Sequence, residues 1–257
     1  ESLRSAIESP EDIEHLTHLP TLGILPGIKA KLGQRSPAQM IAKDPKAPFA
    51  DGIRGVRTAL TLSDGDRKWK CLAVCSAAPK EGKTTVCSAL SVAFAAHEKV
   101  LVIDTDLRKC KLAAAIGIKR SGPGLTELLA GSAEREDCIV HDPLTNVHVL
   151  PAGKAPANPA HLISSQAFHS LIDELRQEYD RIIFDTPPIN ATTDMMFLLD
   201  RLDCIVLVAR SEMTLKAGFK HALKQFANLR APLAGVVLND TAVRPGYAGY
   251  YGYYGRY

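Results

Sequence analysis

The chain has 257 residues, a size that one α/β domain or two smaller domains can fill. Hydrophobic residues make up 46% of it and charged residues 23%, which is the composition of a globular protein with an ordinary core. The formal net charge of +3 is too small to predict nucleic-acid binding, and we see neither a signal peptide nor an apolar run that predicts a membrane span.

The six cysteines form no CxxC pair and show no metal-ligand spacing. Three of them, Cys71, Cys75 and Cys204, lie in apolar runs, where free cysteine behaves as a small hydrophobe. We therefore expect a reducing, cytosolic compartment.

The first 48 residues differ in composition from the rest. A short helix is expected near Ser9, followed by an apolar segment over 22–26 and a linker over 27–49. A solvated linker is the favoured interpretation of its basic residues, and attraction to an anionic membrane surface is the alternative. These basic residues are Lys29, Lys31, Arg35, Lys43 and Lys46.

From residue 49 to residue 240 the pattern predicts one α/β domain. A helix is expected over 49–62, and short apolar runs then alternate with longer helical patterns. Nearly continuous apolar strands separated by helices predict a doubly wound, mostly parallel sheet that helices cover on both faces, with ligands at the carboxyl ends of the strands. The apolar runs are 71–78, 99–104, 146–152, 181–185, 204–210 and 233–239.

A phosphate-binding loop follows the first of these runs. The segment Gly82-Lys83-Thr84 matches the second half of the P-loop pattern, whereas Ala77 stands at the first glycine position. Gly82 lets backbone N–H groups approach phosphate oxygens, Lys83 reaches the β- and γ-phosphates, and the following helix presents its N-terminus. The predicted nucleotide-binding residues of this loop are Ala78, Pro79, Lys80, Glu81, Gly82, Lys83, Thr84 and Thr85.

Two other strands end in carboxylates. Asp104, Asp106 and Arg108 follow one run, and Asp185 ends another before two prolines. Because parallel strand ends lie at one edge of the sheet, we expect Thr84, Asp104 and Asp185 to hold Mg²⁺ beside the phosphates of ATP or ADP.

The same residues predict phosphoryl transfer. Lys83, Asp104 and Asp185 are catalytic candidates, with Asp104 orienting or deprotonating an incoming hydroxyl, and Asp106 and Arg108 form a second tier. For the adenine we select Arg210 and Asn239, which end two late strands.

The chain ends in a run of glycine and tyrosine. Residues 246–257 read GYAGYYGYYGRY and contain no aliphatic side chain larger than alanine, so residues 241–257 are expected to form a solvated, mobile tail. Six phenols beside a phosphate loop suggest a kinase that phosphorylates itself. The candidate acceptors are Tyr247, Tyr250, Tyr251, Tyr253, Tyr254 and Tyr257.

With these motifs in hand, the chain resembles the bacterial tyrosine kinases (BY-kinases) of capsule and exopolysaccharide export, of the Wzc type. The sequences AAPKEGKT, VIDTDLR and IIFDTPP match the family's Walker A, A′ and B motifs, and the tail matches its tyrosine cluster. LPAGKAPANPAHLI matches the segment before its long helix, and SPEDIEHLTHLPTLGILP resembles the segment after its second membrane span.

The resemblance implies a P-loop NTPase architecture like that of MinD and ParA, and a protein-tyrosine kinase that phosphorylates its tail in trans within a ring of its own copies, an octamer in the family. Asp51, Arg54 and Arg57 occupy the positions of the family's ring-forming ExxRxxR helix, with aspartate in place of glutamate. It also implies an upstream transmembrane activator region, a cognate protein-tyrosine phosphatase, a polysaccharide export machinery, and a place at the cytoplasmic face of the bacterial inner membrane. The first residue is Glu1, and we expect the chain to be part of a longer protein.

Two alternatives of other classes stay open. A ParA/MinD-like ATPase would carry a second lysine five residues before Lys83, where this chain has Ala78. A nucleotide-dependent structural subunit of a polysaccharide assembly machine would make phosphorylation incidental. A third interpretation, an adhesive low-complexity tail, leaves the phosphate-site motifs unexplained.

Overall fold

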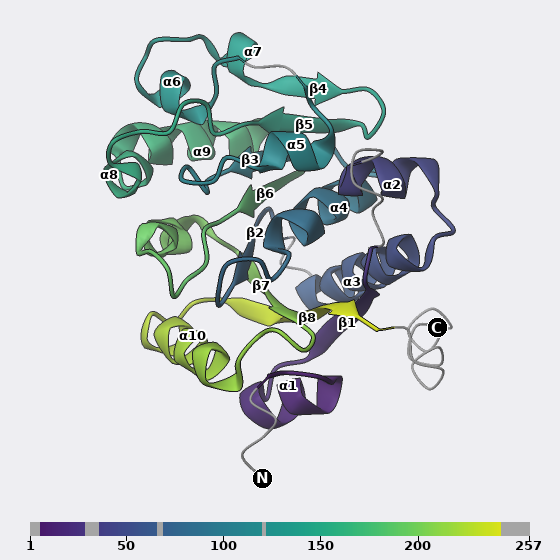
Figure 1. Cartoon of the computed structure of the whole chain (residues 1–257). Coiled ribbons are helices and arrows are strands. Elements are labelled where there is room, and N and C mark those ends of the chain that lie inside the picture. Colours follow the sequence, from purple (N-terminus) through teal and green to yellow (C-terminus); the bar gives the residue numbers. More distant parts are fainter. Residues whose placement is uncertain (1–5, 29–35, 66–68, 120–121, 243–257) are drawn as a thin grey trace.

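The computed structural model describes residues 6–28, 36–65, 69–119 and 122–242, which form one eight-stranded sheet with helices on both faces (Figure 1). The strand order is β1-β8-β7-β2-β6-β3-β5-β4, and every neighbouring pair is parallel except β4–β5. This is the doubly wound α/β fold that the sequence predicts. The strands are β1 (Thr21–Pro26), β2 (Cys71–Ser76), β3 (Val100–Asp104), β4 (Val140–Asp142), β5 (Val147–Leu150), β6 (Arg181–Asp185), β7 (Cys204–Arg210) and β8 (Leu233–Thr241).

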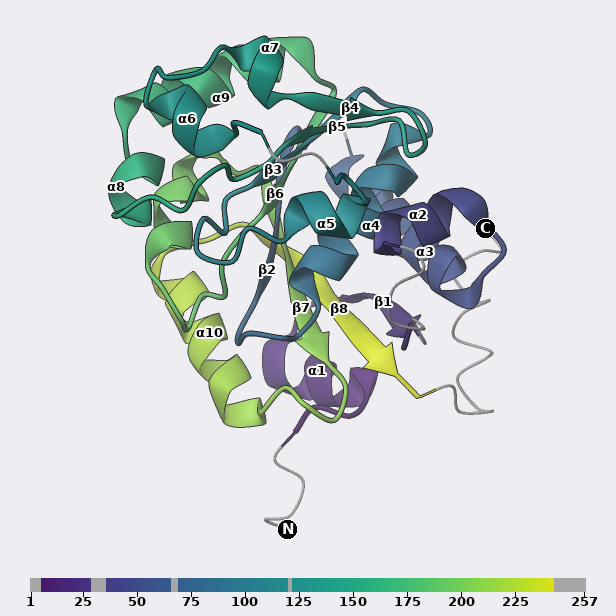
Figure 2. The same ribbon diagram turned by 45° about the horizontal axis from the view of Figure 1, so that its top comes forward.

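The helices divide between the two faces of the sheet (Figure 2). One face carries α2, α3, α4 and α5, and the other carries α8, α9 and α10. The helices are α1 (Pro10–Thr17), α2 (Pro37–Lys43), α3 (Pro48–Asp64), α4 (Lys83–Ala95), α5 (Leu112–Ile116), α6 (Leu125–Leu129), α7 (Arg135–Cys138), α8 (Pro159–Ile163), α9 (Gln166–Glu178), the 3₁₀ helix η2 (Asp194–Arg201) and α10 (Lys216–Asn228).

The interior positions of the central strands are apolar because both of their faces are covered, and polar residues stand only at strand ends. In β2, Cys71, Ala73 and Cys75 enter one hydrophobic core, and Leu72 and Val74 enter the other. All residues of β2, β3 and β6 are buried. An alternating pattern would have exposed one face to water, so these continuous runs select the parallel, doubly covered sheet.

The N-terminal region is more ordered than its composition predicts. The expected linker over 27–49 is wrong for Pro37–Lys43, which form α2 with Ser36 as N-cap and pack on α4. The apolar segment before it forms β1, which pairs in parallel with β8. A boundary at residue 48 therefore divides the sequence but does not separate two packing units.

The first helix begins where its capping residues indicate. The Ser9 side chain accepts the backbone N–H of Asp12, and Pro10 opens α1. Lys216 of α10 forms an ion pair of 2.6 Å with Asp12, which ties α1 to the rest of the domain. Within the described part of the chain, no helix combines the length and apolarity that a bilayer crossing requires.

Asp203 connects the start of β2 to α9. Its Oδ2 accepts the backbone N–H groups of Lys70 and Cys71 at 2.8 and 2.7 Å, and Arg176 Nη2 lies 3.1 Å from its Oδ1. Replacing Asp203 by alanine leaves two backbone donors and a guanidinium without their acceptor.

We expect Asp203→Ala to lower the free energy of unfolding by about 2–4 kcal/mol, measured by urea denaturation. The control is Asp173→Ala, which removes a pair with Arg201 at a side chain that is 54% exposed. That control should cost less than about 1 kcal/mol. Equal losses in the two variants would contradict the role given to Asp203.

Candidate active site

The phosphate loop occupies the turn between β2 and α4. Gly82 is the residue before α4 and has a φ of 96°, in the left-handed region that glycine adopts without strain. A Cβ atom at this position would lie 2.0 Å from Nδ2 of Asn239. Conformation and space together therefore require glycine here.

Glu81 shapes this loop from the inside. Its side chain is buried, Oε2 accepts the N–H of Ala78 at 2.8 Å, and Oε1 accepts the hydroxyl of Thr214 at 2.7 Å. Asn239 Nδ2 donates to the carbonyl oxygen of Glu81 at 3.1 Å. Burial raises the pKa of the Glu81 carboxyl above its ordinary value. The Glu81 side chain thus lies behind the loop, whereas the sequence analysis places this residue among the nucleotide contacts.

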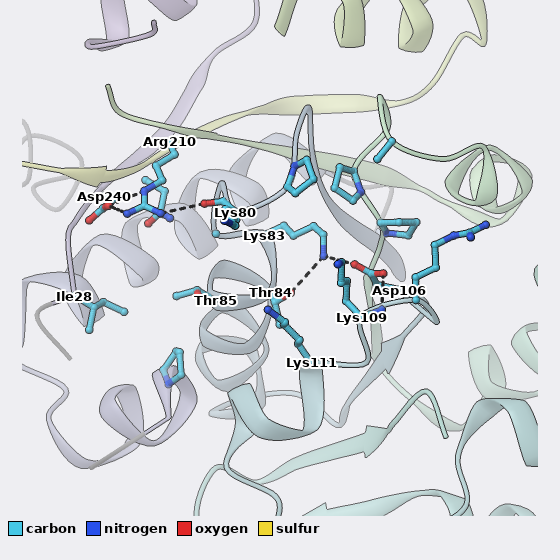
Figure 3. A pocket seen from close by; sticks show the side chains of 18 of the residues that line it. Ile28, Lys80, Lys83, Thr84, Thr85, Asp106, Lys109, Lys111, Arg210 and Asp240 are labelled. Atoms are coloured by element: carbon cyan, nitrogen blue, oxygen red, sulfur yellow. Dashed lines mark hydrogen bonds and ion pairs between the residues drawn. The ribbon is translucent and has the colours of Figure 1, made fainter. Parts of the chain in front are cut away.

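Lys83 lies at the centre of a cluster of charges (Figure 3). Its Nζ is 2.8 Å from Asp106 Oδ2, 3.7 Å from Asp185 Oδ1 and 3.4 Å from the hydroxyl oxygen of Thr84. Burial disfavours the Lys83 charge, but Asp185 and Asp106 hold the pKa of its ammonium above the ordinary value. Asp106, a second-tier candidate in the sequence, is thus a direct partner of the P-loop lysine.

Asp185 and Thr84 offer the ligands that a magnesium ion prefers. The Thr84 hydroxyl donates to Asp185 Oδ2 at 2.7 Å, while the buried Asp185 Oδ1 accepts no hydrogen bond. Burial raises the pKa of Asp185 to about 6, although Lys83 and the Thr84 hydrogen bond oppose the shift. A hydroxyl and a carboxylate with a free oxygen fit Mg²⁺, which keeps several non-protein ligands. Among the described residues, no cluster of three or more His, Cys, Asp or Glu could hold a metal ion without other ligands.

Asp104 lies beside Asp185. The two are register partners on the parallel strands β3 and β6, so their side chains leave the sheet on the same face. Asp104 Oδ1 accepts the N–H of Asp106 at 3.2 Å, and its Oδ2 accepts that of Leu112 at 3.1 Å. Burial, followed by the neighbouring Asp185 carboxylate, raises the pKa of Asp104 well above its ordinary value.

A cavity of about 650 Å³ opens over the phosphate loop, which is within the range of small-molecule sites. Figure 3 shows residues of the phosphate loop around it, together with residues of the segment 105–111 between β3 and α5, which we call the A′ turn. The predicted residues that line it are Pro79, Lys80, Gly82, Lys83, Thr84, Thr85, Asp106, Arg108, Arg210 and Asn239. Four predicted residues do not line it: Glu81, Asp104 and Asp185 are buried, and Ala78 is exposed elsewhere on the loop.

Arg210 links the end of β7 to the phosphate loop. Its Nε donates to Asp240 Oδ2 at 2.7 Å, and its Nη1 donates to the carbonyl oxygen of Lys80 at 3.1 Å. Arg108 forms a two-point contact with Asp194, at 2.8 and 3.1 Å. Both arginines therefore have internal partners as well as access to the cavity.

The sequence analysis does not identify the partners Asp194, Asp240 and Thr214. Asp240 directly follows the candidate Asn239, and that position at a strand end is a usable signal. Nothing in the sequence distinguishes the buried Asp194 from acids at the surface, because its role depends on η2 lying beside Arg108.

The candidate interface residues lie on α3. Arg54 Nη2 is 3.0 Å from Asp51 Oδ1 in an exposed pair, while Arg57 Nη1 donates to the Ala93 carbonyl oxygen of α4 at 3.2 Å. Arg57 thus has a partner in its own chain. The six tail tyrosines lie outside the described residues.

A glycine turn at a strand end, a lysine at the start of the following helix and acids on two neighbouring strands define a P-loop nucleotide-binding site. In agreement, a family model described as an AAA domain matches residues 70–234. Among solved structures, the kinase domain of *Escherichia coli* tyrosine kinase ETK has a TM-score of 0.85 and 25% identity, covering 93% of this chain and 96% of that one. MinD of *Pyrococcus horikoshii* OT3, complexed with Mg-ADP, has a TM-score of 0.56 and 25% identity, over 71% of this chain and 76% of that one.

Curated relatives are more specific. Tyrosine-protein kinase YwqD of *Bacillus subtilis* (strain 168) is 35% identical over 214 residues, which cover 82% of this chain and 90% of that protein. Tyrosine-protein kinase Ptk of *Acinetobacter johnsonii* is 30% identical over 249 residues, and this chain spans 33% of its length. The chain belongs to the bacterial tyrosine-protein kinases, the BY-kinases of the Wzc type.

The raised pKa of Asp185 leads to a prediction about stability. Its ionised form is less stable in the folded chain than in the unfolded chain, so the penalty is absent below the ordinary pKa of 3.8 and complete above about 6. Asp185→Asn removes this charge and retains an acceptor for Thr84. Without nucleotide or metal, we expect the variant to gain on the order of 2 kcal/mol at pH 7 and little at pH 4.

Urea unfolding at both pH values in the presence of a chelator measures this difference. Asp173→Asn serves as the control, because it removes the same charge from a side chain that is 54% exposed. A gain at pH 4 as large as that at pH 7, or a loss at pH 7, would refute the assignment.

Proposed function

We propose that this chain is the ATP-dependent kinase region of a protein that phosphorylates its own C-terminal tyrosines. The contacts that join Lys83 to Thr84, Asp106 and Asp185 beneath the cavity carry the proposal, and membership of the BY-kinases supports it. The P-loop amides and Lys83 bind the β- and γ-phosphates. Arg210 and Asn239 border the cavity and are the proposed contacts of the adenine.

Thr84 and Asp185, with Asp104 on the adjacent strand, are the proposed magnesium ligands. The ion, when bound, neutralises phosphate charge. In the transfer, the phenolic oxygen of a tyrosine forms a bond to the γ-phosphorus, and the bond to the β–γ bridging oxygen breaks. ADP leaves, and Asp104 accepts the phenolic proton. Asp106 holds Lys83 in place, and Arg108 fixes the A′ turn through Asp194.

The wider setting is also proposed. The acceptors are the tail tyrosines Tyr247, Tyr250, Tyr251, Tyr253, Tyr254 and Tyr257, which neighbouring copies in a ring present to one another. An upstream transmembrane activator would stimulate the kinase at the inner face of the bacterial membrane. A cognate phosphatase would reverse the reaction, and phosphorylation would regulate capsular or exopolysaccharide export.

Incubation with ATP and Mg²⁺, followed by mass spectrometry of the tail, tests the kinase. We expect phosphate on several tail tyrosines of the unaltered protein and none in Lys83→Met. In Asp104→Asn we expect the rate of phosphorylation to fall by about 100-fold or more. Lys224→Met, at an exposed position on α10, is the matched control. Release of inorganic phosphate with unmodified tyrosines would instead favour the ATPase alternative.

Self-association is tested on α3. Asp51 and Arg54 are exposed side chains three residues apart, a spacing that places them together on one helix face. We expect Arg54→Ala to lower the assembled mass in sedimentation, and Thr58→Ala, an exposed change on the same helix, to leave it unaltered. An unchanged mass in Arg54→Ala would remove this interface.

A further inference from the structure

The lining of the cavity carries more positive charge than its own acids balance. It includes six cationic residues and the two acids Asp106 and Asp240. Lys83, Arg108 and Arg210 form ion pairs with Asp106, Asp194 and Asp240, respectively. No residue in the described ranges forms an ion pair with Lys80, Lys109 or Lys111. Lys80 belongs to the phosphate loop, which leaves Lys109 and Lys111 on the A′ turn.

These two lysines stand on a fixed turn. The Lys109 N–H donates to Asp106 Oδ1 at 3.2 Å, and the Cys110 N–H donates to the Asp106 carbonyl oxygen at 2.9 Å. Cys110 has a φ of 49°, and the N–H of Leu112, two residues later, donates to Asp104 Oδ2 at 3.1 Å. The acids of the candidate active site thus hold the backbone that carries Lys109 and Lys111.

Figure 3 shows the Lys109 and Lys111 side chains beside Asp106 and Thr84, at the end of the cavity away from Arg210. Both lysines are exposed, so their ammonium groups can meet a ligand without first losing an internal partner. An anionic group that is not part of the nucleotide could form ion pairs with these two lysines.

The acceptor segment lacks acids before it is modified. Residues 246–257 contain Arg256 and no Asp or Glu, so side-chain anions appear there only when tyrosines are phosphorylated. A phosphotyrosine carries about −1.5 to −2 charges at neutral pH. Successive tyrosines in this segment are one to three residues apart, so a modified tyrosine stays close to the next acceptor.

Resting on the kinase function above, we propose that Lys109 and Lys111 form a phosphotyrosine subsite beside the transfer site. A tail that already carries one phosphate binds through it and presents a neighbouring tyrosine to the γ-phosphate. The first modification of a tail therefore accelerates the next, and tails pass from unmodified to multiply modified with few singly modified forms.

Synthetic GYAGYYGYYGRY peptides test this with the intact protein, ATP and Mg²⁺. One peptide is unmodified, and another carries phosphate at the position of Tyr254. We expect kcat/KM for adding a further phosphate to be about fivefold higher for the phosphorylated peptide, with the advantage shrinking at high salt. Peptides differ in mass from the protein's own tail, so their products are counted separately.

The variants assign the effect to the subsite. In Lys109→Ala/Lys111→Ala the ratio of the two kcat/KM values should fall to about one, whereas Lys109→Arg/Lys111→Arg should retain most of it. Lys220→Ala/Lys224→Ala removes the same charge from the exposed face of α10 and should keep the ratio. Equal rates for the two peptides, or a ratio that survives the alanine substitutions, would overturn the proposal. A higher KM for ATP with an unchanged ratio would assign the lysines to the nucleotide instead.

Peptide binding without ATP separates this proposal from the kinase function. Fluorescence anisotropy should show tighter binding of the phosphorylated peptide, and this preference should disappear in the alanine variant. If the preference is present but neither peptide is phosphorylated, the kinase function fails and the subsite stands. If both peptides are phosphorylated without a preference, the subsite alone fails.

Discussion

The structure depends on concentrating like charges at one edge of a buried sheet. Asp104 and Asp185 are register partners on adjacent strands, and burial raises the pKa of both. Lys83 offsets part of this repulsion through its contacts with Asp106 and Asp185. Such a cluster opposes folding, and the hydrophobic packing of the two sheet faces offsets it. The carboxylates of Asp104 and Asp185 are also the groups whose repulsion a bound cation would reduce.

The fold produces this arrangement through a small number of contacts around the phosphate loop. Gly82 adopts a backbone conformation that strains other residues, Glu81 accepts an N–H of the loop from its buried side, and Asn239 from β8 donates to the Glu81 carbonyl oxygen. The contacts of Glu81 with Thr214 and Asn239 join segments that lie far apart in the sequence. The phosphate loop therefore keeps its form through β7 and β8 as well as through β2 and α4.

Sequence reasoning could predict the features that depend on local pattern. The continuous apolar runs identify the parallel sheet, and the residues after them, Lys83, Asp104 and Asp185, lie together because parallel strands end at one edge. Features that depend on tertiary contacts could not be predicted from the sequence. The helix α2 is missed because Lys, Pro and Ala resemble a linker until Ile41 and Ala38 are seen packed against α4. The Arg108–Asp194 pair depends on the placement of η2, which no periodicity encodes.

The parallel pairing of β1 with β8 places the end of β1 close to residues that border the nucleotide site. Gly27 follows β1, and a Cβ atom there would lie 2.3 Å from Asp240 Oδ1. Asp240 in turn holds Arg210, which contacts the Lys80 carbonyl oxygen. A displacement of β1 relative to β8 would therefore disturb Asp240 first, and through Arg210 the backbone of the phosphate loop at Lys80.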